Sequence, residues 1–274
     1  MSDIKLLALD LDGTLFTTEK TVSDENKEAL QKAREKGVKV VITTGRPLKA
    51  IGNLLEELDL ISENDYSITF NGGLVQRNTG DILDKSSLSR EQLADLHTML
   101  DNTGLPTDIL SDGIVYSIPS GDRKSQYHMA NPLLTFVEVE NFEQVPKDIV
   151  YNKVVTVTDA DFLDKQIAQL PEWLFENFEA YKSRDIIFEL MPKGVHKAFG
   201  LNLLCNHLGF EASQVMAMGD EANDLSMLAW AGLGVAMANG VDIAKKTAKA
   251  VTTKTNDQSG VAEAVKRYIL DEVE

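Results

Sequence analysis

Short, unbroken apolar runs alternate with amphipathic stretches along the first part of the chain. Leu6–Leu9 is entirely apolar, and residues 38–42 and 68–70 form further runs with many β-branched side chains. Buried strands of a parallel sheet have this continuous apolar pattern. Between the runs, Ser23 can cap a helix that Gly37 closes, and a second helix is expected to continue through Leu55. Alternating strands and helices predict a parallel sheet covered by helices.

The pattern changes between residues 84 and 191. Strands are expected there at 154–157, 179–183 and 186–190, with a helix at 162–170 and polar segments interrupted by prolines. After residue 191 the alternation returns, with helices at 196–207, 224–231, 243–248 and 261–270 and strands at 215–218 and 234–236. We therefore predict an α/β protein with a doubly wound, parallel-sheet core of residues 1–83 and 192–274. An α+β unit of residues 84–191 is inserted into this core.

The net charge and composition of the chain limit the binding partners and the cellular compartment that are expected. The 274 residues carry a net charge of −16, which repels nucleic acid and anionic lipid, so neither is expected as a partner. A single cysteine, Cys205, fits a reducing compartment. Because the first residues lack the features of a signal peptide and no apolar stretch reaches membrane-spanning length, a cytoplasmic protein is expected. The sequence leaves a monomer and a homodimer both open.

Two carboxylates follow the first predicted strand. Asp10 and Asp12 are two positions apart, so on an extended chain both side chains face the same way, and Gly13 allows a sharp turn behind them. Two acids this close need a cation or a shared proton. An isolated motif of this kind is more often an ordinary turn at a strand end, so its meaning depends on the other segments.

Three further segments carry polar groups at strand ends or helix starts. Residues 43–46, Thr-Thr-Gly-Arg, offer a hydroxyl and backbone N–H groups to an anion. Lys197 is expected at a helix N-terminus, which is the wrong end for the helix dipole and suggests a nearby anion, although a surface lysine is the simpler explanation. Residues 219–224 place Asp220, Glu221 and Asp224 at a strand end, where carboxylates suit a hard cation and also serve as helix caps.

Together these segments resemble the motifs of the haloacid dehalogenase (HAD) superfamily of phosphohydrolases, and within it the Cof-type branch of YidA-like sugar phosphatases. The resemblance is carried by residues 10–15, 43–47, 69–72, Lys197 and 219–224, and it extends along the whole chain. One departure is Ala198, where the branch usually has glycine.

The resemblance implies a magnesium-dependent phosphatase that acts on small phosphorylated metabolites, among them sugar phosphates. Asp10 would be the nucleophile that forms an aspartyl-phosphate, and Asp12 would be the general acid and base. The implied phosphate-binding residues are Leu11, Thr44, Gly45, Lys197 and Asn223, and the implied Mg²⁺ ligands are Asp10, the backbone carbonyl of Asp12, and Asp220. Asp224 would support the metal ligands from behind or contact a metal-bound water. Arg46 and Asn71 would lie near the mouth of the site, although a surface arginine and a turn asparagine are the simpler interpretations. The inserted unit would be a C2-type cap that selects the leaving group.

Two other functions fit the same residues. A phosphosugar mutase uses much the same nucleophile and cap but returns the phosphoryl group to a sugar. A non-catalytic metabolite-binding protein would keep the pocket without turnover, although all the charged groups that turnover needs are present here. Cys205 is interpreted as a buried structural thiol, and the four histidines form no metal-binding pair.

Overall fold

The structure, a computed structural model, describes residues 3–272. The chain divides into two compact units. The core unit comprises the residues up to Gly45, Asn53–Lys85 and those from His196 onward, and the inserted unit comprises Arg46–Gly52 and Ser86–Val195. The sequence-based boundaries lie at residues 84 and 191 and do not assign Arg46–Gly52 to the insert. That the core catalyses and the insert selects substrates stays a prediction.

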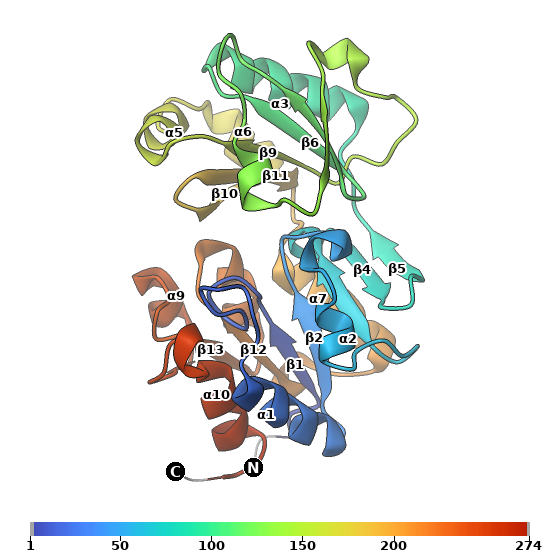
Figure 1. The fold of residues 1–274 in the computed structure, drawn as a ribbon, viewed down its shortest axis with the longest axis vertical. Helices are drawn as coiled ribbons and strands as arrows, with labels where there is room; N and C mark the ends of the chain where they lie inside the picture. The colour runs from blue at the N-terminus through green and yellow to red at the C-terminus, as the bar shows by residue number, and fades with distance from the viewer. Residues whose placement is uncertain (1–2, 273–274) are drawn as a thin grey trace. The chain divides into compact units, whose positions relative to one another are not determined.

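The core unit is built on an eight-stranded sheet (Figure 1). Its order is β14 (Ala250–Val251), β13 (Leu233–Ala236), β12 (Val215–Gly219), β1 (Leu6–Leu9), β2 (Lys39–Thr43), β3 (Tyr66–Thr69), β4 (Leu74–Arg77) and β5 (Ile82–Lys85). The strands from β14 to β3 are parallel, whereas β4 and β5 are antiparallel. Leu9 is level with Met218 on one side and with Ile42 on the other, so β12, β1 and β2 end at the same edge.

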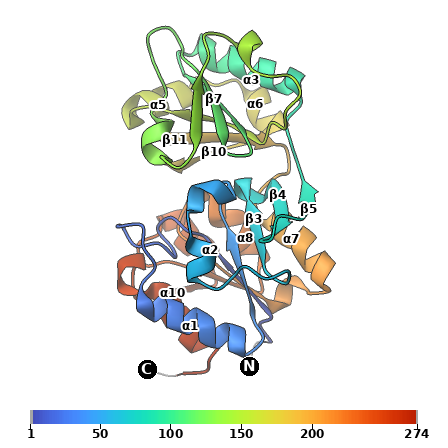
Figure 2. The same ribbon diagram turned by 45° about the vertical axis from the view of Figure 1, so that its right-hand side comes forward.

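Helices cover both faces of this sheet. On one face, α7 (Lys197–Leu208) and α8 (Leu225–Trp230) bury Leu201, Leu204 and Met227 against Leu6 and Ala8. On the other side, α1 (Asp24–Glu35) and α10 (Gly260–Tyr268) lie next to each other (Figure 2). The remaining helical segments of the core unit are α2 (Leu54–Glu57), α9 (Asp242–Thr247) and the 3₁₀ turns Phe70–Gly72, Ala212–Gln214, Ala222–Asp224 and Asn256–Gln258.

The inserted unit has a six-stranded sheet of its own. Its order is β10 (Phe178–Arg184), β11 (Ile187–Pro192), β9 (Lys153–Val157), β6 (Thr107–Ser111), β7 (Ile114–Ile118) and β8 (Thr135–Glu138), and only the β7–β8 pair is parallel. Three helices pack an apolar cluster onto one face (Figure 1): α3 (Arg90–Asn102), α5 (Ala160–Ile167) and α6 (Glu172–Asn177). The shorter segments are α4 (Tyr127–Ala130) and the 3₁₀ turns Leu48–Ile51 and Phe142–Gln144.

The predicted fold class is confirmed, and the details differ at particular places. The sheet is not entirely parallel, because β4 and β5 extend it antiparallel. The helix expected through Leu55 is divided into Leu48–Ile51 and Leu54–Glu57, because Gly52 between them adopts a φ of +62°. The strand expected to reach Phe70 ends at Thr69, since Phe70 and Asn71 have φ values of 50° and 53°. Within residues 3–272 no helix is both long and apolar enough to cross a membrane.

Candidate active site

Asp10 directly follows β1, at the edge of the sheet where β12, β1 and β2 end, and the other site residues lie around it. Its backbone N–H donates to the Met218 carbonyl at 3.0 Å, which continues the sheet pairing by one residue. The residue is only 6 % exposed. The apolar run that makes β1 a buried strand therefore also delivers Asp10 into a buried position.

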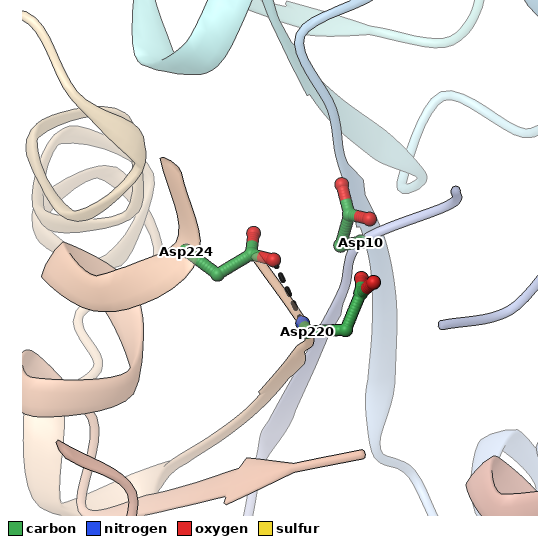
Figure 3. Close-up of side chains that lie close together, drawn as sticks. All are labelled: Asp10, Asp220 and Asp224. Carbon is green, nitrogen blue, oxygen red and sulfur yellow. Dashed lines mark hydrogen bonds between the residues drawn. The ribbon is translucent and has the colours of Figure 1, made fainter. Parts of the chain in front are cut away.

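Asp220 and Asp224 come from the turn after β12 and approach Asp10 (Figure 3). Ligand oxygens of the three carboxylates lie within 4.8 Å of one another. Asp224 also shapes the turn, because its Oδ2 accepts hydrogen bonds from the backbone N–H groups of Asp220 at 2.9 Å and Glu221 at 3.0 Å. Of the three acids that the sequence places in this turn, Asp220 and Asp224 join Asp10 in a cluster of buried aspartates, whereas Glu221 lies outside that cluster.

Lys197 is the first residue of α7 and is completely buried. Its ammonium group donates to Asp10 Oδ1 at 2.5 Å and to Asp224 Oδ1 at 2.6 Å. These two carboxylates explain why a lysine is tolerated at a helix N-terminus. Although burial alone would lower the pKa of Lys197, Asp10 and Asp224 raise it above its ordinary value, so the side chain stays charged.

The single positive charge of Lys197 cannot neutralise all three carboxylates of the cluster. Burial, together with neighbouring negative charge, raises the pKa of Asp10 to about 7 and that of Asp220 to about 9. When all are ionised, three carboxylates and one ammonium leave two net negative charges, which one divalent cation neutralises. Clustered carboxylate oxygens are the ligands that hard cations such as Mg²⁺ prefer, so the residues fit this ion.

The roles of the three acids toward a cation differ. Asp224 has Oδ1 bonded to Lys197 and Oδ2 bonded to two backbone N–H groups, so it is suited to orienting its neighbours. Asp220 Oδ1 accepts the Thr14 hydroxyl at 3.0 Å. A Cβ atom at Gly13, which has a φ of +79°, would lie 2.1 Å from Asp220 Oδ2, so glycine is required for Asp220 to occupy this place.

A second group of predicted residues meets beside the strand ends. The Asn71 N–H donates to the Thr44 carbonyl at 3.0 Å, and the Asn223 amide donates to Asn71 Oδ1 at 3.1 Å. A Cβ atom at Gly45 would lie 2.9 Å from both amide atoms of Asn71. Asn71, whose role the sequence left undefined, therefore connects the Thr44–Gly45 segment to Asn223. Its left-handed backbone conformation is one that asparagine adopts more readily than most residues.

The remaining predicted residues, Asp12, Leu11 and Arg46, do not belong to the aspartate cluster. The Asp12 side chain is 22 % exposed, and it forms an ion pair with Lys20 at 2.6 Å. Leu11 is buried, and its carbonyl accepts the N–H of Phe16 at 2.8 Å. Arg46 belongs to the inserted unit and donates to the Ala50 carbonyl at 3.1 Å. Sequence reasoning missed Lys20, since a single lysine in a polar loop carries no recognisable signal.

Known proteins similar in sequence or in fold to this chain include hydrolases and phosphatases. The family model for haloacid dehalogenase-like hydrolases matches residues 7–265. M6_Spy0533 of Streptococcus pyogenes, which is assigned to the phosphatases, is 35 % identical over 98 % of this chain and 99 % of its own. The 5-amino-6-(5-phospho-D-ribitylamino)uracil phosphatase YcsE of Bacillus subtilis is 33 % identical over 98 % of this chain and 97 % of its own. A haloacid dehalogenase-like hydrolase from Bacteroides thetaiotaomicron has a similar structure, with a TM-score of 0.81, 31 % identity and coverage of 96 % of this chain and 99 % of that one.

The fold and the buried aspartate–lysine cluster define a hydrolase of the α/β class. The chain belongs to the haloacid dehalogenase-like hydrolases, and within that family it is a phosphatase. The family resemblance seen in the sequence is thereby confirmed.

Proposed function

We propose that the chain is a Mg²⁺-dependent phosphomonoester hydrolase that transfers the phosphoryl group of a small phosphorylated metabolite to Asp10 and then to water. The contact of Lys197 with Asp10 and Asp224, next to Asp220, is the observation that carries this proposal. It combines a buried carboxylate nucleophile, a fixed positive charge and an oxygen-rich place for a cation. When bound, Mg²⁺ would be held by Asp10, Asp220 and the Asp12 carbonyl, and it would supply positive charge to the phosphoryl oxygens.

In the first step, an Asp10 carboxylate oxygen attacks phosphorus and the bond to the leaving oxygen breaks. The Asp12 carboxyl gives its proton to that oxygen, so the alcohol leaves neutral. Lys197 stabilises the charge that spreads over the phosphoryl oxygens. Thr44, Gly45, Asn223 and the segment at Leu11 supply further hydrogen-bond donors in this proposal.

In the second step, a water oxygen attacks phosphorus and gives its proton to the Asp12 carboxylate. The bond between phosphorus and Asp10 then breaks, which releases inorganic phosphate and restores the Asp10 carboxylate. The acid of the first step is therefore regenerated by the second, and the cycle closes without any other proton donor.

The substrates proposed are sugar and sugar-alcohol phosphates. The relative YcsE, which acts on a phosphoribityl compound, supports this class. The inserted unit could recognise hydroxyl groups, because the face of its sheet opposite the apolar cluster carries buried Asp108 and the buried Lys153–Glu189 ion pair. These three residues are the candidates for selecting the leaving group.

A panel of phosphorylated metabolites tests the proposal, with inorganic phosphate and isomerised sugar phosphate measured separately. We expect phosphate release that EDTA abolishes and Mg²⁺ restores, and that Asp10→Asn abolishes while leaving the far-UV circular dichroism unchanged. Asp81→Asn, an exposed aspartate in the turn between β4 and β5, is the matched control and should keep full activity. Isomerisation without phosphate release would indicate a mutase instead. Full activity of Asp10→Asn would overturn the assignment of the nucleophile.

A further inference from the structure

Asp12, the acid and base of the proposed mechanism, has a partner that the sequence motifs do not include. Lys20 lies eight residues further along the chain, and its ammonium group contacts Asp12 Oδ1 at 2.6 Å. The Lys20 side chain is half exposed, whereas Asp12 is 22 % exposed. Both residues lie in the loop that follows β1, and the contact brings the end of this loop back to the Asp12 carboxyl group near its start.

The backbone of this loop sets the position of Lys20. Lys20 has a φ of +63°, a left-handed conformation that lysine rarely adopts, and its N–H donates to the Thr17 carbonyl at 2.9 Å. The Thr17 N–H donates in turn to the Thr21 carbonyl at 2.8 Å, and the two threonine hydroxyls are 2.9 Å apart. A tight turn over Thr17–Thr21 therefore places Lys20, and an unfavourable backbone conformation is maintained to do so.

The C-terminal part of the core unit holds the same loop. Asp257 accepts both the backbone N–H and the hydroxyl of Thr18, each at 2.7 Å. Asn256 donates to the Phe16 carbonyl at 2.9 Å, and Asn239 donates to the Gly13 carbonyl at 2.8 Å. These bonds join segments more than 200 residues apart in the sequence, so the loop is fixed by the folded core and not by local turns alone.

We propose that Lys20 is a positioning residue, which holds the Asp12 carboxyl group in the orientation needed to transfer a proton to the leaving oxygen. This inference rests on the proposed function, since it requires Asp12 to be the acid. With Oδ1 bound to the Lys20 ammonium, rotation of the carboxyl group is restricted. Correct orientation matters because proton transfer needs the carboxyl oxygen within hydrogen-bond distance of the leaving oxygen.

This role makes a prediction that a general structural role does not. In the first step, an alkoxide leaving group needs the Asp12 proton as its bond to phosphorus breaks, whereas dinitrophenolate leaves without protonation. The specificity constant kcat/KM reports only the steps up to departure of the alcohol. A loss of Asp12 orientation should therefore lower kcat/KM for alkyl phosphates and spare it for dinitrophenyl phosphate.

The experiment compares Lys20→Ala with the wild type on dinitrophenyl phosphate and on the best alkyl phosphate from the metabolite panel. We expect kcat/KM for the alkyl phosphate to fall at least about tenfold, which is a partial loss of the roughly 10²–10⁴-fold that general acid catalysis contributes, and that for dinitrophenyl phosphate to stay within about twofold. Lys20→Arg should restore the alkyl phosphate activity. Lys32→Ala removes a lysine of similar exposure that is paired with Glu28 at 2.9 Å, and it should change kcat/KM for neither substrate.

The outcomes separate the inference from the proposed function. An equal loss with both substrates would show that Lys20 only maintains structure, and no loss with either would show that it is not needed; both results overturn the inference. Asp10→Asn should be inactive toward both substrates. If it is, and Lys20→Ala shows no dependence on the leaving group, the inference alone fails. If Asp10→Asn stays active, the proposed function fails.

Discussion

Replacing Lys197 with methionine should destabilise the core unit in a way that depends strongly on pH. The variant keeps most of the side-chain volume but leaves Asp10 and Asp224, both buried, without the ammonium group that contacts them at 2.5 and 2.6 Å. Removing one partner of a buried ion pair typically costs about 3–5 kcal/mol, because the remaining charge stays desolvated. We expect a loss of this size at pH 8.

The sign of the pH dependence follows from the carboxylates. Burial already raises the pKa of Asp10 to about 7 in the wild type, and loss of the lysine raises it further. An acid whose pKa is higher in the folded than in the unfolded protein makes the fold less stable as the pH rises through the folded pKa. Each additional proton bound by the folded state changes the stability by about 1.4 kcal/mol per pH unit. The difference between variant and wild type should therefore be small at pH 5 and largest at pH 8.

The two tryptophans allow the core unit to be observed by itself. Trp230 lies on α8 in the core unit, and Trp173 lies on α6 in the inserted unit. In a Trp173→Phe background, Trp230 fluorescence reports unfolding of the core unit during urea titration in EDTA. A Lys32→Met control should differ from the wild type by less than about 0.5 kcal/mol at either pH. An equal destabilisation by Lys197→Met at pH 5 and pH 8 would refute the reasoning, because the cost would then not come from unpaired charge.

Three other predictions follow from the same structure. Since the pKa values of Asp10 and Asp220 are raised to about 7 and about 9, Mg²⁺ must displace protons, so its affinity measured by calorimetry should rise from pH 6 to pH 8; a constant affinity would contradict this. Gly13→Ala should weaken Mg²⁺ activation by about tenfold or more by displacing Asp220, whereas Gly37→Ala, at a φ of +85° with nothing within 4 Å, should not. Burial raises the pKa of Asp108 to about 6, so ionisation costs stability as the pH rises through that value. Denaturation should show Asp108→Asn gaining about 2 kcal/mol on the wild type between pH 4.5 and pH 7.5, and no relative gain would contradict the assignment.

The sequence predicts the central strands well because their physical signal is strong. Leu6–Leu9 and Val215–Gly219 are apolar throughout and completely buried, and this pattern has few other solutions. The antiparallel strands β4 and β5 were missed because they lie at the edge of the sheet, where Ile82 is exposed and polar residues alternate irregularly. Helix α3 was also missed, although Ser89 and Gln92 form a capping box that marks its start.

Site residues could be predicted where a strand end fixes their place, and not where a tertiary contact does. Asp10 and Asp220 follow apolar runs, so the parallel sheet brings them to one edge. Lys20 contacts Asp12 only because a turn and bonds from the C-terminal segment fold its loop back. The role of Asp224 depends on which of its oxygens bind Lys197 and which bind backbone N–H groups, and spacing along the chain carries no such information.

The charge of the cluster indicates an order of binding in the proposed mechanism. Asp224 and Lys197 neutralise each other, which leaves Asp10 and Asp220 as two uncompensated carboxylates when they are ionised. A phosphate dianion approaching them would meet this local charge and the net charge of −16 on the whole chain. Once a divalent cation is bound, the local charge is cancelled, and neutral donors such as Asn223 and the Thr44 hydroxyl are sufficient to orient the phosphoryl oxygens. We therefore expect the metal to bind before the substrate, because only the metal makes the buried edge of the sheet receptive to an anion.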